Sequence, residues 1–256
     1  MKDESAANGP ANDRGFLYGD GLFETVRVER GEPRFLDRHC RRFQHSAKAL
    51  DFPEQSVSKG LEALQSLTGR RDGLWRVTVT RPGMAGASEA LGTIDVRWRD
   101  FPYATSVDGP GPTLTVVEGF YFPRYWLAEH KTTSWLRSLE ARRQAVNEGF
   151  DEALMVSPDG QIGEAAAANV FLRIADGWVT PAIEGILPGI IREVILHRGR
   201  EVGIEIEERP VYVGDLQMCE SLVLTSTGRL VTAVKGVDEL LFDAEPANEL
   251  KALLQQ

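Results

Sequence analysis

Cysteine is scarce in this chain of 256 residues. Cys40 and Cys219 are the only two, they lie far apart in the sequence, and neither belongs to a CxxC or CxxH motif. This pattern argues against a disulfide framework and against a zinc site, and it fits a reducing compartment.

Long apolar runs, basic stretches and nucleotide motifs are also lacking. No segment approaches the length that spans a membrane, and the first 15 residues are polar rather than signal-like. The formal net charge is -9, which makes a broad nucleic-acid surface unexpected. No GxGxxG or GxxxxGK[ST] motif offers a dedicated phosphate loop. We therefore expect a soluble cytoplasmic protein that acts on a small molecule, with neither a nucleic acid nor a membrane as partner.

Hydrophobic patterning predicts an α+β protein of two domains. Apolar residues alternate over Leu22–Leu36 on both sides of a turn, which predicts a hairpin, and Asp37 is placed to cap a following helix. The turn-rich segment Ser106–Pro112 has no periodicity and indicates a boundary. The expected domains are residues 1–108 and residues 109–256.

Lysine is scarce too, with six among the 29 basic residues, and Lys131 has an unusual setting. It ends the aromatic and apolar stretch FYFPRYWLAEHK and precedes Thr-Thr-Ser-Trp and a predicted helix. Burial disfavours an ammonium group, so a lysine desolvated there becomes available as an imine-forming nucleophile. The local sequence by itself favours a plainer alternative, a lysine at a strand end whose amine reaches solvent.

Glu164 begins the segment EAAAAN between two predicted strands. A carboxylate followed by four alanines is not a solvated run of charge, and the small side chains indicate that a ligand or another backbone approaches closely. The segment fits a functional carboxylate as well as it fits a turn glutamate beside a tightly packed strand.

Three further features could bind an anion. Leu187–Arg192 places a helix start, with Pro188 at its first turn, directly after a loop, and free amides at a helix start attract anions. Thr225–Gly228 offers hydroxyls and turn amides at a strand end. Arg42 could clamp a phosphate group, although an exposed helical arginine is the simpler interpretation. Each feature is weak alone, and the four histidines show no metal-ligand spacing.

Taken together, these segments resemble the class IV aminotransferases, the fold-type IV family of enzymes that use pyridoxal 5′-phosphate (PLP). The family includes branched-chain aminotransferases, D-amino-acid aminotransferases and 4-amino-4-deoxychorismate lyase. The resemblance rests on seven segments that occur in the family's order over nearly the whole chain: Asp13–Thr25, Asp37–Arg42, Lys131–Leu136, Asp151–Ala153, Glu164–Asn169, Gly185–Gly189 and Thr225–Thr227.

The resemblance implies a role for each candidate residue. Lys131 would bind the PLP aldehyde as a Schiff base and then carry the substrate proton. Glu164 would pair with the pyridinium nitrogen, so that the ring acts as an electron sink. The phosphate group would be bound by three segments of the chain, through the side chain of Arg42, the amides of Ile190 and Ile191, and Ser226 with Thr227. The implied fold is a smaller N-terminal α/β domain and a larger, β-barrel-like C-terminal domain with helices.

Two activities within the family remain open. Gly21–Arg27 and Glu164–Asn169 look more like the lyase, which expels pyruvate and leaves 4-aminobenzoate, a folate precursor. However, the Lys-x-Leu-Asn pattern common in lyases is absent, and no paired-cation loop follows Arg81. We expect the lyase, with a D-amino-acid or branched-chain aminotransferase as the alternative.

A third possibility is a PLP-free binding protein with the same fold. The presence of Lys131, Glu164 and Arg42 argues against it. The family's active sites lie between the two domains and are usually completed by a second subunit. The resemblance therefore implies a homodimer.

Overall fold

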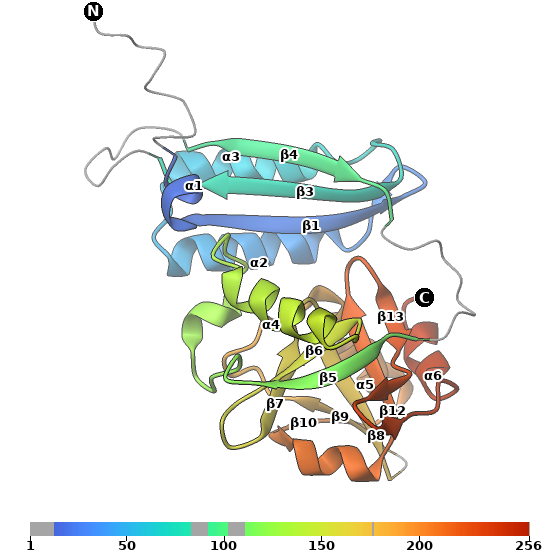
Figure 1. Ribbon diagram of the computed structural model, residues 1–256. Coiled ribbons are helices and arrows are strands. Elements are labelled where there is room, and N and C mark those ends of the chain that lie inside the picture. Colours follow the sequence, from blue (N-terminus) through green and yellow to red (C-terminus); the bar gives the residue numbers. More distant parts are fainter. Residues whose placement is uncertain (1–12, 83–91, 102–110, 176, 256) are drawn as a thin grey trace, which may run out of the picture. The chain divides into compact units, whose positions relative to one another are not determined.

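The computed structural model describes residues 13–82, 92–101, 111–175 and 177–255. The chain forms two compact units, each with its own sheets and helices (Figure 1). Unit 1 comprises Met1–Ala104 together with His130–Trp135, and unit 2 comprises Thr105–Glu129 together with Leu136–Gln256. The α+β class expected from the sequence is confirmed. Most of the predicted boundary segment lies outside the described residues.

Unit 1 is built on one antiparallel sheet with the strand order β2-β1-β3-β4. Its strands are β1 (Gly21–Glu29), β2 (Glu32–Pro33), β3 (Gly73–Thr80) and β4 (Ile94–Arg99). Its helices are α1 (Arg14–Tyr18), α2 (Leu36–Ala49) and α3 (Glu54–Gln65). Alternation along β1 and β3 directs Leu22, Val26 and Val77 to one face, where they pack against Phe43 of α2 and Leu64 of α3.

The predicted hairpin is present, because β1 and β2 pair across Arg30 and Gly31, which both have positive φ. The prediction that Asp37 caps the next helix was wrong. Helix α2 begins at Leu36, and its N-cap is Phe35, which has a left-handed backbone and no capping side-chain hydrogen bond. Asp37 instead lies in the first turn of α2, where its carboxylate interacts favourably with the positive end of the helix dipole.

Unit 2 contains two sheets that share a core. The five-stranded sheet has the order β10-β9-β8-β12-β13, and the six-stranded sheet has the order β11-β7-β6-β5-β14-β15. Leu154 and Ile162 of one sheet pack in the same cluster as Leu172 and Leu222 of the other, so both sheets enclose one apolar interior.

The strands of unit 2 are β5 (Thr113–Glu118), β6 (Glu152–Val156), β7 (Gln161–Ala165), β8 (Asn169–Ile174), β9 (Gly177–Pro181), β10 (Ile206–Arg209), β11 (Val211–Tyr212), β12 (Cys219–Ser226), β13 (Leu230–Ala233), β14 (Gly236–Val237) and β15 (Leu240–Leu241). The helices are η3 (Trp126–Glu129), α4 (Leu136–Asn147), α5 (Ile190–Val202), η4 (Val213–Met218) and α6 (Ala247–Ala252). Among the residues that the structure describes, no helix is both long enough and apolar enough to cross a membrane.

Candidate active site

Lys131 lies in the segment His130–Trp135, which packs in unit 1 although its neighbours in sequence belong to unit 2. The segment aligns antiparallel to the start of β1. The amide of Phe23 donates to the Lys131 carbonyl at 2.9 Å, and the amide of Thr133 donates to the Gly21 carbonyl at 2.8 Å. Gly21 allows this approach, because a Cβ there would lie 2.9 Å from Thr133 Oγ1. Backbone pairing therefore fixes the position from which Lys131 projects.

The amine of Lys131 lies beside a pair of packed aromatic rings. Its Nζ is 4.6 Å from the centre of the Phe23 ring and 5.3 Å from the centre of the Trp135 ring, and the two rings pack 5.5 Å apart. Aromatic faces attract a cation and displace water from it. Lys131 is half-buried.

Arg42 is buried on the face of α2 that packs against the sheet, and it forms an ion pair with Glu24 of β1. Its Nε donates to Glu24 Oε1 at 2.8 Å, and Nη2 donates to Oε2 at 2.6 Å. The fixed, fully buried pair makes Arg42 a structured cation, whereas an exposed helical arginine would be mobile.

His39 completes this buried group, and the sequence analysis identified neither His39 nor Glu24. The His39 Nδ1 to Glu24 Oε2 distance is 2.7 Å. Burial would raise the pKa of Glu24, but the charge and hydrogen bonds of Arg42, with His39, lower it to about 2. Burial lowers the pKa of His39, so a neutral ring donates from Nδ1. Its Nε2 is fully buried and has no hydrogen-bond partner in the described parts of the chain.

Arginines gather on the face of the unit 1 sheet that carries Phe23. Strand register places Thr25, Arg76 and Arg97 side by side across β1, β3 and β4. It places Arg27, Leu74 and Arg99 side by side in the next row. The guanidinium of Arg76 lies 3.6 Å from the centre of the same Phe23 ring that Lys131 contacts. Burial and the nearby Arg99 lower the pKa of Arg76.

Glu164 lies near the end of β7 in unit 2 and is buried. Its Oε2 accepts from Asn169 Nδ2 at 3.2 Å and from the amide of Leu187 at 3.3 Å. The alanines after Glu164 form a tight turn, in which the Ala165 amide donates to the Ala168 carbonyl at 2.8 Å. The small side chains therefore let the backbone turn closely beside a carboxylate that is fixed in place.

Helix α5 begins at Ile190 immediately after Gly189, which has no side chain to cap the helix. The amides of Ile190 and Ile191 lie in the first turn, where the backbone lacks intrahelical acceptors and the helix dipole is positive. Both side chains are buried, so they anchor the turn while its amides point along the helix axis. A Cβ at Gly189 would overlap Asn169 Oδ1, and Asn169 donates to Glu164, so the helix start packs directly against the Glu164 group.

Ser226 and Thr227 follow at the end of β12. The Ser226 hydroxyl accepts from the Arg229 amide at 3.2 Å and so closes a turn. The neighbouring Thr225 hydroxyl is buried and has no hydrogen-bond partner among the described residues. Because β8 and β12 pair Asn169 with Thr225, this strand end lies beside the Glu164 group.

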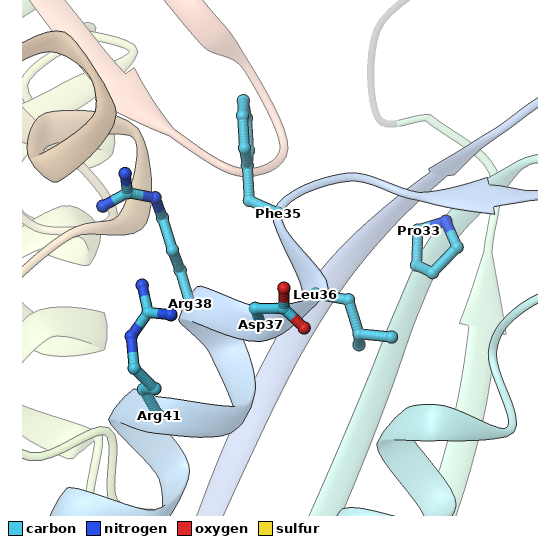
Figure 2. A pocket seen from close by; sticks show the side chains of 6 residues that line it. All are labelled: Pro33, Phe35, Leu36, Asp37, Arg38 and Arg41. Atoms are coloured by element: carbon cyan, nitrogen blue, oxygen red, sulfur yellow. The ribbon is translucent and has the colours of Figure 1, made fainter. Parts of the chain in front are cut away.

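A separate hollow of about 480 Å³ lies at the start of α2 (Figure 2). Figure 2 shows the guanidinium groups of Arg38 and Arg41 side by side, with Phe35 and Asp37 also lining the hollow. None of the candidate site residues lines it. No group of three or more side chains suited to a metal ion occurs in the described ranges.

The family model of class IV amino-transferases matches residues 21–237. The chain belongs to this family. It is 30% identical to a putative branched-chain-amino-acid aminotransferase of Methanocaldococcus jannaschii, over 99% of the chain and 91% of that relative. It is 26% identical to the aminodeoxychorismate lyase of Bacillus subtilis, over 99% of the chain and 89% of that relative.

The fold is also that of the family. A PLP-bound hypothetical aminotransferase from Mycobacterium tuberculosis superposes with a TM-score of 0.84, covering 96% of this chain and 91% of its own. At 24% identity, that likeness establishes the fold alone. The fold-type IV class implied by the sequence is therefore confirmed, and the class IV relatives include both aminotransferases and lyases.

Proposed function

We propose that this protein is a PLP-dependent 4-amino-4-deoxychorismate lyase. The reaction expels pyruvate and leaves 4-aminobenzoate. Because 4-aminobenzoate is a folate precursor, we propose that the enzyme acts in folate biosynthesis, in the cytoplasm. The observation that carries the proposal is the row of arginines on the same sheet face as Phe23 and Lys131.

The side chains and amides present in each unit fit the parts of PLP. In unit 2, the first-turn amides of Ile190 and Ile191 and the hydroxyls of Ser226 and Thr227 suit a phosphate group. A buried Glu164 carboxylate suits a protonated ring nitrogen. In unit 1, Lys131 supplies the amine that binds the aldehyde, and Arg42 supplies a fixed cation for the phosphate group.

PLP, when bound, withdraws electrons from the substrate carbon that carries the amino group. The remaining chemistry belongs to Lys131. Once its amine is displaced by the substrate, the neutral Nζ takes the proton from that carbon. The Phe23 and Trp135 rings favour this transfer, because their contacts with the amine help to orient it. Cleavage of the neighbouring carbon–oxygen bond then releases pyruvate as its enol, and Lys131 can return the proton.

The arginines fit the charge of the substrate. Aminodeoxychorismate carries two carboxylates on a rigid skeleton, and Arg76, with Arg99 in the adjacent row, can pair with anions near Lys131. Arg27 of the same row already forms an ion pair with Glu29. The sequence has no such paired cations in the loop after Arg81, most of which lies outside the described residues, so the proposal rests on the arginines of the strands.

The alternative is an aminotransferase, which the 30% identity to a putative branched-chain enzyme favours. A branched-chain amino acid brings one carboxylate and an apolar side chain. Its apolar group would lie against a face on which three strands present arginine. That mismatch is why the lyase is proposed first.

One assay separates the two activities. The purified protein with PLP is given aminodeoxychorismate, and pyruvate and 4-aminobenzoate are measured without any added 2-oxoacid. We expect equal amounts of both products. In parallel, L-leucine and D-alanine are supplied with 2-oxoglutarate. Amino transfer that depends on 2-oxoglutarate, with no 4-aminobenzoate formed, would replace the lyase by the aminotransferase.

We further propose that the enzyme is a homodimer. Helix α1 supports this, because none of its residues is buried and Phe16 and Tyr18 are 72% and 61% exposed. Contiguous exposed aromatic side chains are typical of an interface rather than of a solvent-facing surface.

A further inference from the structure

The turn after β12 holds a strained backbone. Thr227, Gly228 and Arg229 connect β12 to β13, and Ser226 pairs with Leu230 across the turn. Leu230 has a φ of 58°, a left-handed conformation that residues other than glycine rarely adopt. Such a conformation persists only where surrounding contacts impose it, and it is common where a ligand is clamped.

A buried carboxylate lies beside this turn. Glu152, the first residue of β6, is completely buried. Its Oε2 is 3.8 Å from Nη2 of Arg229, and its Oε1 is 4.0 Å from Nε of Arg142. Oε1 also accepts from the Ala153 amide at 3.2 Å, while Oε2 has no hydrogen bond within the described residues.

The burial of Glu152 is costly for a carboxylate. A buried carboxylate loses its hydration, and ion pairs at about 4 Å return only part of that loss. Consistent with this, burial raises the pKa of Glu152 despite the opposing charges of Arg142 and Arg229. The Oε2 atom, without a hydrogen bond but next to Arg229, therefore points to a role for this acid at the turn.

We propose that Glu152 is a positioning residue that acts through Arg229. By pairing with the Arg229 guanidinium, it fixes the Ser226–Arg229 turn in the conformation that binds the phosphate group of the cofactor. The link is direct, because the Arg229 amide bonds the Ser226 hydroxyl and the left-handed Leu230 follows at once. This inference rests on the proposed PLP site.

Two effects of removing the carboxylate have opposite signs. As a mere negative charge, Glu152 repels phosphate, so Glu152→Gln would strengthen phosphate binding. As an anchor of Arg229, it orders the turn, so the same change would weaken phosphate binding. The direction of the change in affinity therefore separates the two roles.

The test titrates PLP, and separately inorganic phosphate, into full-length cofactor-free protein by calorimetry. We expect Glu152→Gln to weaken both affinities about tenfold. Glu220→Gln is the matched control, because it removes an exposed carboxylate from β12, the strand that leads into the Ser226–Arg229 turn, and it should bind like the wild type. In an Arg229→Gln background, Glu152→Gln should have no further effect, since the anchor is already lost.

Each failure has a distinct signature. If the wild type binds no PLP, the proposed function fails. If the wild type binds PLP and Glu152→Gln binds either ligand as tightly or more tightly, the positioning role is overturned. Should Glu152→Gln not fold, Arg229→Lys decides the question. That change keeps the positive charge but alters the length and hydrogen-bonding geometry of the side chain. Unchanged phosphate affinity in a folded Arg229→Lys protein would refute the proposal.

Discussion

At the scale of the residue, Lys131 is the side chain on which the proposed chemistry depends. We expect Lys131→Ala to abolish the reaction and the visible absorbance of covalently bound PLP, because in the described parts of unit 1 no other lysine amine is found over the Phe23 and Trp135 rings. Absorbance spectra and pyruvate release would be measured after reconstitution with PLP. Lys48→Ala, a change on the exposed side of α2, should leave both signals intact.

Glu24 makes the stability of the protein depend on pH. Its pKa in the folded state is about 2, below the ordinary 4.5, so its contribution to stability is complete above pH 4.5 and is lost as the pH falls towards 2. We expect the free energy of unfolding, measured with urea over this range, to fall with pH. In Glu24→Gln the decline should be smaller.

The same variant should lose stability at neutral pH. Glu24→Gln leaves Arg42 and His39 buried without their carboxylate, which typically costs about 3 kcal/mol or more. Glu32→Gln, at an exposed position of β2, serves as the control and should match the wild type. Equal stability of Glu24→Gln and wild type at neutral pH would contradict the buried ion pair.

Some of these residues could have been found in the sequence, and others could not. Glu24 lies on the same face of β1 as Leu22, Val26 and Val28. An acid at such a core position indicates that it has a buried partner. The arginine row gave no such signal. It depends on the register between β1 and β3, which two helices and several loops separate in the sequence, and local patterning does not fix that register.

At the scale of the element, the start of α5 joins the two halves of the proposed site in unit 2. A methyl group at Gly189 would overlap Asn169 Oδ1, and Asn169 bonds both Glu164 and the Leu187 carbonyl. We expect Gly189→Ala to weaken PLP binding about tenfold by displacing these groups.

Titration of the cofactor-free variant with PLP measures this effect. Gly214→Ala is the control, because a Cβ at Gly214 would meet nothing within 4 Å. The backbone of Gly189 has a negative φ, so the change introduces crowding without backbone strain. If Gly189→Ala binds PLP like Gly214→Ala, the helix start and the Glu164 group are not coupled.

The sequence located this helix start to within two residues. Pro188 was predicted at the first helical position, but α5 begins at Ile190 with Gly189 as its N-cap, so Pro188 precedes the helix. The sequence also misplaced the start of α2, where Asp37 is the expected cap and Phe35 is the actual one. Capping preferences of about 1 kcal/mol are readily overridden when tertiary packing decides where a helix begins. Here Leu36 packs against the unit 1 core, and α2 begins two residues earlier than the predicted start at Arg38.

At the scale of the whole molecule, the proposed homodimer can be tested through α1. We expect light scattering of the wild type to give twice the mass of one chain. Replacing both Phe16 and Tyr18 by serine should shift the protein towards the monomer, because these exposed rings supply apolar contact area. As a control, Met218→Ser removes another exposed apolar side chain, 74% exposed, far along the chain in η4. A wild type that is monomeric at all concentrations would refute the proposal.

The order in which the chain is synthesised gives the His130–Trp135 segment a further consequence. Residues up to Ala104 leave the ribosome well before Lys131, yet the starting edge of β1 pairs with the backbone of Lys131 and Thr133. Until that segment arrives, the amides and carbonyls of Gly21 and Phe23 form an open strand edge, which is a template for pairing with other chains. The nascent N-terminal part is therefore exposed to aggregation until the segment with the reactive lysine closes the sheet, and a fragment that ends before residue 130 would keep that edge open permanently.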